Sequence, residues 1–169
     1  MSNFHAVSTQ EFSSLFDRIG NDWMLITASD GERTNSMTAS WGCFGILWNK
    51  PVAVCFIRPQ RYTFEMTEKS DRLSLTFFTQ EHRKALAYMG AHSGRDGDKY
   101  DATGLHINKD ENGTPYPAEA HTVVLCKTLY AGRLQKDAFL DPEIIAKHYP
   151  ADDYHQMYVC EIEQVLVRD

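Results

Sequence analysis

Two short apolar runs separated by a proline constrain the fold of this chain more than any other feature. Residues 44–48 and 52–57 are apolar almost throughout, and the two runs are expected to join at Pro51, which lies between them. Runs of this length are typical of β-strands and too short for ordinary helices, and the near-continuous apolarity of the second run predicts a strand buried on both faces. Small hydroxyl residues precede the first run and two arginines follow the second. This arrangement suits a ligand with a flat apolar body, polar edges and an anionic end.

Other segments repeat the strand-like pattern. Residues 73–78 begin with alternating apolar and polar side chains, and an Asp30-Gly31 turn joins a strand over residues 23–27 to one that begins near Arg33 and carries residues 35–41. Further strands are expected at residues 52–57, 121–134 and 156–167, with two short ones between Gly104 and Pro115. Because strands outnumber helices without strict alternation, the sequence predicts a mainly β fold, a closed or partly closed β-barrel with peripheral helices.

Four segments carry helix signals. Residues 8–19 open with Ser8 and Glu11 at capping-box spacing and stop before Gly20. Their apolar face comprises Phe12, Leu15, Phe16 and Ile19. Further helices are expected at residues 62–69, 81–89 and 141–148, with a polar loop over residues 91–99. Each is short, so the helices are expected to lie around the barrel and not to form a layer of their own.

Length and charge bound the class of protein. A chain of 169 residues predicts one domain over residues 1–169. The net charge of -6 argues against broad binding to nucleic acid or to an anionic membrane. No apolar run reaches the roughly 18 residues of a membrane span, and the first residues lack the pattern of a signal peptide. The cytoplasm is therefore the expected location.

The common signatures of catalytic and metal sites are missing from the sequence. Neither a Gly-x-Gly-x-x-Gly fingerprint nor a Walker loop is present, and the seven histidines show no metal-ligand spacing, so no metal site is expected. A hydrolase built on Ser93 has no identifiable partner acid. Cys55, Cys126 and Cys160 lie in strand-like segments and are expected to be buried thiols, whereas Cys43 follows the polar cluster and could stand near a ligand.

Six motifs in order along the chain resemble the flavin reductase-like family. They are Asn-Ser-Met-Thr-Ala-Ser-Trp-Gly at residues 35–42, Leu-Trp-Asn-Lys-Pro at 47–51, Arg-Pro-Gln-Arg-Tyr-Thr at 58–63, Lys-Ala-Leu at 84–86, Ser-Gly-Arg-Asp-Gly-Asp-Lys at 93–99 and Thr-Gly at 103–104. The likeness runs from about Trp23 to the end of the chain, including Tyr154-His155 and residues 161–167. It is strongest to short flavoredoxin-type proteins, which hold FMN in an antiparallel Greek-key split β-barrel. The resemblance therefore implies that fold and that cofactor.

The resemblance also implies roles for individual residues. The flavin ring is expected to lie against one strand, whose contacts would come from Asn35, Met37, Thr38, Ala39, Ser40 and Trp41. The phosphate is expected near Arg58, Arg61, Tyr62 and Thr63, where a helix N-terminus and a guanidinium group favour an anion. Ser93, Gly94 and Lys99 would complete the phosphate site. Trp23 and Trp48 are expected in the core. Two residues depart from the pattern: Cys43 replaces a small residue, typically glycine, and His82 replaces an aromatic one.

Three functions remain open on these grounds. The first is a flavin reductase that takes hydride from NADH or NADPH and passes electrons to an acceptor. The second is an electron carrier with tightly bound FMN that a protein partner reduces. The third, an oxidase of the pyridoxamine phosphate type, would share the barrel but lacks its motifs here. The resemblance also implies a homodimer with the cofactor near the subunit interface. No catalytic residue can be assigned from the sequence.

Overall fold

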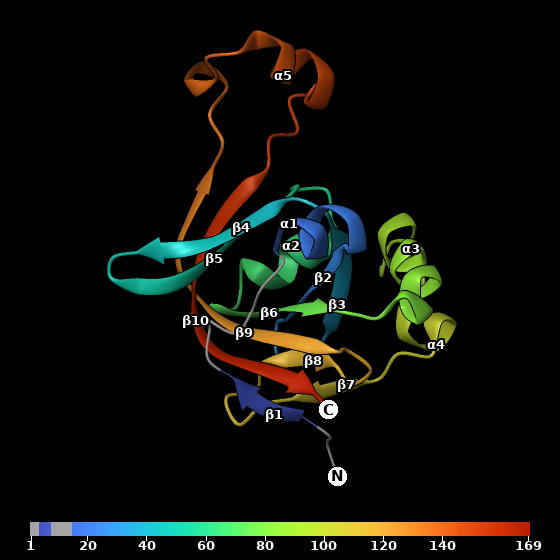
Figure 1. Cartoon of the computed structure of the whole chain (residues 1–169). Helices are drawn as coiled ribbons and strands as arrows, with labels where there is room; N and C mark the ends of the chain where they lie inside the picture. Colours follow the sequence, from blue (N-terminus) through green and yellow to red (C-terminus); the bar gives the residue numbers. More distant parts are fainter. Residues whose placement is uncertain (1–3, 8–14) are drawn as a thin grey trace.

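The fold is built on one antiparallel sheet of eight strands in the computed structural model, which describes residues 4–7 and 15–169 (Figure 1). The strands are β1 (Phe4–Val7), β2 (Met24–Ser29), β3 (Thr34–Ala39), β4 (Gly42–Leu47), β5 (Lys50–Ile57), β6 (Arg72–Phe77), β9 (Thr122–Arg133) and β10 (Gln156–Arg168). Seven of them pair in the order β3-β2-β6-β9-β10-β5-β4, and β1 pairs with β10. The short strands β7 (Ile107–Lys109) and β8 (Pro115–Pro117) form a separate hairpin. The mainly β, antiparallel prediction is confirmed.

The barrel is split between β3 and β4. These strands follow one another in the sequence but stand at opposite ends of the pairing order. On the far side, β10 pairs with β9 along most of its length, while its two halves are flanked by β5 and β1 in turn. One edge of β3 therefore has no strand beside it in the described part of the chain.

Short helices lie around the barrel and on an arm that extends from it. They are α1 (Leu15–Asp17) with the π turn η1 (Arg18–Asp22), α2 (Tyr62–Thr67), η2 (Gln80–His82), α3 (Arg83–Ala91), α4 (Lys99–Thr103), η3 (Lys136–Ala138) and α5 (Pro142–His148). The expected helices at residues 62–69, 81–89 and 141–148 are confirmed to within a few residues. The expected capping box at Ser8 and Glu11 lies outside the described residues, and of the apolar face Ile19 is buried while Phe16 is almost fully exposed. No described helix has the length and apolar character needed to cross a membrane.

Two apolar clusters hold the molecule together. The larger fills the barrel and includes Ile26, Leu75 and Tyr158, and the smaller lies between the sheet, α3 and β8 and includes Leu86 and Met89. The expected burial of Cys55, Cys126 and Cys160 is confirmed. In the 52–57 strand, by contrast, Val54 and Phe56 are only half-buried, so burial on both faces is incomplete.

The β4–β5 hairpin corrects two expectations. Its turn lies at Trp48 and Asn49, both with positive φ (52° and 58°), and not at Pro51, which stands inside β5 opposite Ile46. A turn with positive φ at both central residues matches the twist of a tight hairpin. Trp48 at this tip is 55% exposed, so its expected place in the core was wrong.

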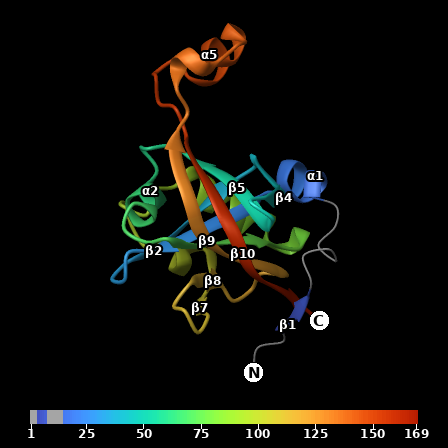
Figure 2. The same ribbon diagram turned by 90° about the vertical axis from the view of Figure 1, so that its left-hand side faces the viewer.

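An arm extends from the barrel on the ends of β9 and β10 and carries η3 and α5 (Figures 1 and 2). Its base is fastened to the barrel through Arg58, which pairs with Asp153 and donates to the carbonyl oxygen of His148 at 2.8 Å. Its outer residues are poorly covered, because Leu140 is fully exposed and Ile144 is 41% exposed.

Candidate functional site

A groove follows β3 and consists of three hollows that share one side chain. The Lys99 hollow (about 180 Å³) lies between β3, the start of α2 and the loop after α3, the Trp41 hollow (about 170 Å³) lies toward the base of the arm, and the Leu86 hollow (about 340 Å³) lies toward α3. Arg61 lines all three, and residues of β3 line each of them. The hollows therefore form a continuous groove with Arg61 at its junction.

Arg61 brings an uncompensated positive charge to this junction. Its side chain has no carboxylate partner and no hydrogen bond in the part of the chain that the structure describes, and burial lowers the pKa of its guanidinium group. Its backbone N–H is bonded to the carbonyl oxygen of Arg58 at 3.0 Å, which fixes where the side chain leaves the backbone. A half-buried charge without a partner costs free energy that an anion in the groove would offset.

The unpaired edge of β3 presents main-chain polar groups to the groove. The carbonyl oxygen of Ser36 accepts a hydrogen bond from Lys99 and therefore points away from β2. Because these directions alternate along a strand, the N–H and C=O groups of Thr38 point the same way. The hydroxyl of Thr38 donates to the carbonyl oxygen of Leu86 on α3, so its main chain and not its side chain is available to a ligand.

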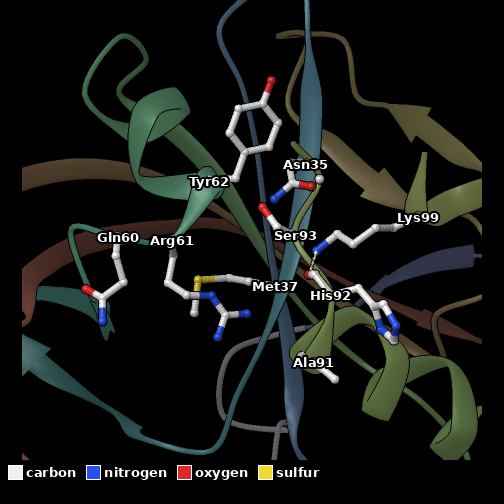
Figure 3. Close-up of a pocket in the computed structure, with 11 residues that line it drawn as sticks. Asn35, Met37, Gln60, Arg61, Tyr62, Ala91, His92, Ser93 and Lys99 are labelled. Atoms are coloured by element: carbon white, nitrogen blue, oxygen red, sulfur yellow. Dashed lines mark hydrogen bonds between the residues drawn. The ribbon is translucent and has the colours of Figure 1, made fainter. Parts of the chain in front are cut away.

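Lys99 borders the groove with its donors already occupied. Its ammonium group donates to the carbonyl oxygens of Ser36 (2.6 Å), Met89 (3.0 Å) and His92 (3.3 Å), and the side chain is buried. Burial, and then the positive charge of Arg61, lower the pKa of Lys99 to about 8, which keeps it mostly charged at neutral pH. Figure 3 shows Lys99 and Arg61 reaching into the same hollow from opposite sides. Lys99 thus supplies charge to the hollow while its bonds tie β3, α3 and α4 together.

Thr63 lies beneath the hollow and not on its surface. It is fully buried in the first turn of α2, and its hydroxyl accepts a hydrogen bond from the Asn35 amide at 2.8 Å. This bond orients the other side of the Asn35 amide toward the Lys99 hollow, which Asn35 lines. Tyr62, the first residue of α2, lines the same hollow together with Ser93 and Gly94.

The Trp41 hollow is closed by an aromatic cluster at the base of the arm. Trp41 packs against His148 and His155 with ring centroids 5.2 and 5.3 Å apart, and Phe56 and Arg58 also line the hollow. His155 is buried, and its Nδ1 atom lies 2.9 Å from the hydroxyl of Tyr149. Burial and then the positive charge of Arg58 lower the pKa of His155 to about 4, so that the imidazole is neutral at pH 7.

Twelve of the thirteen residues expected at the site line one of the three hollows, and the thirteenth, Thr63, supports Asn35 from below. Arg58, however, lines the Trp41 hollow with its guanidinium group held by the arm. Sequence reasoning assigned no role to Gln60, Phe56 and His155, all of which line the groove. His155 stands in the Tyr154-His155 pair of the family resemblance, a signal that could have identified it.

Cys43 lies outside the groove. It is exposed on β4 and borders a separate, mainly apolar cavity of about 500 Å³ together with Ile19 and Phe44. Trp41 lines both this cavity and the Trp41 hollow. Burial raises the pKa of the Cys43 thiol, which therefore stays protonated at neutral pH. Ser40 and Trp41, which line both spaces, thus form the boundary between the Cys43 cavity and the groove.

Comparison with known proteins assigns the family. The pattern described as "Flavin reductase like domain" matches residues 16–169. The chain belongs to the flavin reductase-like family. No curated relative matches this family member significantly.

Solved structures share the fold of this flavin reductase-like chain. A flavin reductase-like FMN-binding domain from Shewanella baltica superposes with a TM-score of 0.72 at 16% identity, covering 99% of this chain and 78% of the other. Flavoredoxin of Desulfovibrio vulgaris gives 0.69 at 19% identity, covering 87% and 69%. An NADH:FAD oxidoreductase of Streptomyces globisporus, solved with NAD and FAD fragments, gives 0.63 at 14% identity, covering 87% and 80%. The expected split β-barrel is confirmed.

Proposed function

We propose that this chain binds FMN in the groove along β3 and acts as an NAD(P)H-dependent flavin reductase. The observation that carries the proposal is the half-buried guanidinium group of Arg61 where the three hollows meet, which has no partner among the residues that the structure describes. A phosphate monoester in the Lys99 hollow would satisfy this charge with a hydrogen-bonded ion pair. The apolar walls and free strand edge of the other two hollows suit a flat ring with polar edges.

The groove residues fit a flavin in their chemistry as well as their shape. The N–H of Thr38 faces the groove as a hydrogen-bond donor, and Trp41 and Phe56 offer apolar surface beside it. FMN, when bound, supplies a ring that accepts hydride and passes electrons on singly or in pairs. A main-chain donor held at the ring edge stabilises negative charge there, because the strand holds it in place at no reorganisation cost. Neutral His155 closes the hollow without adding to the positive charge of Arg58 and Arg61.

The reductase reading draws support from a structural neighbour whose name specifies NADH as its donor. The alternative, an electron carrier of the flavoredoxin type, draws equal support from another neighbour. Anaerobic mixing of the FMN-loaded protein with NADH and NADPH separates the two. Rapid bleaching of the flavin absorbance by either donor is the expected result. A flavin that stays oxidised with both donors would contradict the reductase function and support the electron-carrier function.

The cofactor assignment has its own test. The purified protein should be yellow, and denaturation should release FMN rather than FAD. If the protein is purified without flavin and is colourless, it should take up added FMN, and the fluorescence of the FMN should be quenched. Failure to bind FMN at micromolar concentration would remove the proposal.

A second copy of the chain is the proposed partner of β4. This edge strand exposes Ile46 (74%) and Leu47 (40%), and the residues directly before and after it, Trp41 (45%) and Trp48 (55%), are exposed as well. An uncovered apolar edge of this kind is a hazard in a monomer and a common site of association. Light scattering should report a homodimer, and Ile46→Glu should shift the protein toward the monomer. A wild-type monomer at micromolar concentration would contradict this assignment.

A further inference from the structure

A fourth hollow lies directly beyond the Lys99 hollow. This Arg33 hollow has a volume of about 270 Å³ and is lined by Arg33, Thr34, Asn35, Tyr62, Gly94, Gly97, Asp98, Lys99 and Tyr100. Four of these residues, Asn35, Tyr62, Gly94 and Lys99, also line the Lys99 hollow. The shared residues therefore lie on the boundary between two polar spaces.

On this boundary Asn35, Tyr62 and Gly94 form a closed wall, because Gly94 packs tightly against the other two residues. A Cβ atom added to Gly94 would lie 2.3 Å from the Asn35 side-chain oxygen and 2.8 Å from a ring carbon of Tyr62. Even a methyl group therefore has no room between the backbone of Gly94 and these two side chains. Asn35 cannot easily move away, because it is buried and its amide is bonded to Thr63.

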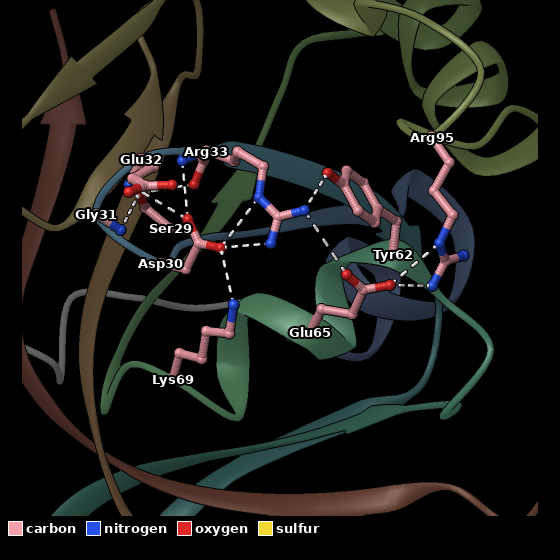
Figure 4. Close-up of polar contacts among 9 residues, drawn as sticks. All are labelled: Ser29, Asp30, Gly31, Glu32, Arg33, Tyr62, Glu65, Lys69 and Arg95. Carbon is pink, nitrogen blue, oxygen red and sulfur yellow. Dashed lines mark hydrogen bonds and ion pairs between the residues drawn. The ribbon is translucent and has the colours of Figure 1, made fainter.

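Tyr62 is held in the wall by two arginines. Its hydroxyl accepts a hydrogen bond from the Arg33 guanidinium at 2.8 Å, and the guanidinium carbons of Arg33 and Arg95 lie 5.4 and 5.0 Å from its ring centroid (Figure 4). Arg95 is itself bonded to Glu65 and to the carbonyl oxygen of Gln60. The ring is therefore fixed from both sides by charged groups.

The Asp30 network fixes Arg33 in turn. The guanidinium group forms two hydrogen bonds with the Asp30 carboxylate, at 2.6 and 3.1 Å. The backbone N–H of Arg33 and then its guanidinium group hold the pKa of Asp30 well below its usual range. The pair stays ionised across the pH range in which the protein would work, so Tyr62 keeps this support.

We propose that the wall of Asn35, Tyr62 and Gly94 limits the groove to a flavin monophosphate by blocking entry of an adenylate into the Arg33 hollow, and that Tyr62 sets the preference for FMN over FAD. The inference rests on the proposed FMN function. When the phosphate of a ligand pairs with Arg61, that phosphate lies next to the wall. FMN ends there, whereas FAD continues through a second phosphate to adenosine and would have to displace the ring of Tyr62.

The test is a set of titrations of flavin-free protein with riboflavin, FMN and FAD. The wild type should bind FMN more tightly than FAD by roughly 5- to 150-fold, the range expected from forcing a packed wall apart. Tyr62→Ala should shrink this ratio by at least about fivefold, mainly through tighter FAD binding. Tyr62→Phe is the matched control, because it keeps the ring and loses only the bond to Arg33, and it should retain the wild-type ratio.

A double variant tests where the adenylate goes. When the Tyr62 side chain is removed, the Arg33 guanidinium loses one acceptor and can donate into the opened space. The double variant Tyr62→Ala with Arg33→Gln should therefore not show the gain in FAD affinity that Tyr62→Ala shows alone. A gain that survives this change would overturn the Arg33 hollow as the adenylate site. Thermal unfolding without flavin reports whether each variant folds, and Tyr62→Val, a smaller truncation, replaces Tyr62→Ala if that variant does not.

The outcomes separate this inference from the proposed function. Wild-type protein that binds FAD as tightly as FMN overturns the wall and leaves the flavin function intact. An unchanged FMN to FAD ratio in the truncated variant does the same. Protein that binds none of the three flavins, including riboflavin, which does not reach the wall, overturns both.

Discussion

Arg58 and Arg61 stand three residues apart and serve two regions of the molecule in opposite ways. At the base of the arm, Arg58 pairs with Asp153, bonds to the backbone of His148 and stacks over the ring of Tyr149. In the floor of the groove, Arg61 has no partner among the described residues. One guanidinium group is used up in holding the fold, and the other remains available for a ligand. A basic motif therefore identifies a binding residue only after its internal partners are known.

Removal of the Arg61 charge should give the largest effect on cofactor binding. Arg61→Gln should weaken FMN binding by about 10- to 150-fold, the equivalent of losing a charge-assisted hydrogen bond of about 1.5–3 kcal/mol. Riboflavin, which has no phosphate, should lose far less affinity. Paired titrations of the flavin-free variant with both ligands measure the difference. Equal losses of affinity for the two ligands would place the phosphate away from Arg61. Arg61 would then not differ from Arg58 in its availability to the ligand.

Lys99 should show its largest effect in stability. Lys99→Met leaves two buried carbonyl oxygens and one part-buried carbonyl oxygen without their donor, and the free energy of unfolding should fall by about 1–3 kcal/mol. Its charge also lies near Arg61, so FMN affinity should fall more than riboflavin affinity. Urea unfolding and the same paired titrations measure both effects. Lys84→Met, at an exposed position of α3, is the matched control and should change neither. Full stability in the Lys99 variant would show that its bonds are not structural.

Arg58→Gln is the counterpart of the Arg61 variant and should act on the arm. The ion pair with Asp153 is about a quarter exposed on each side, so the expected loss of stability is about 1 kcal/mol or less. Proteolysis of the arm should become faster, because its base loses one fastening point. FMN affinity should change much less than in Arg61→Gln. A loss of FMN affinity as large as in the Arg61 variant would mean that Arg58 leaves the arm to bind the ligand.

The last expected effect is absent at neutral pH and appears only in acid: a pH dependence of stability from His155. Its folded-state pKa of about 4 lies below the ordinary value, so between about pH 4 and 6.5 the unfolded chain binds a proton that the folded chain does not. Stability should therefore fall as the pH drops through this window, and His155→Phe should make the fall shallower. Urea unfolding at several pH values measures the slope. An unchanged slope would show that His155 is protonated in the folded protein, which would add a positive charge beside Arg58.

Local pattern was enough to predict most of the fold. The strands at residues 23–27, 73–78, 121–134 and 156–167 and the helix that starts at Asp141-Pro142 appear within a few residues of their expected bounds. Alternating side chains and the Asp-Gly turn are properties of neighbouring residues, so the sequence carries them directly. The hairpin turn at Trp48 was missed because Pro51 indicated a boundary between the two strands. In the structure this proline is tolerated within the pair of strands.

The sequence by itself determined the strands of the sheet other than β1, the family, and the segments of the chain from which the groove is built. Only the tertiary structure decided what each polar group in those segments is free to do. Arg58 is occupied by Asp153, 95 residues away, and Lys99 by the carbonyl oxygen of Ser36, 63 residues away, while Arg61 meets no such partner within residues 4–7 and 15–169. The physical reason is that strand and helix signals come from neighbours in the sequence, whereas the pairing of a charge depends on groups that folding brings together from distant parts of the chain.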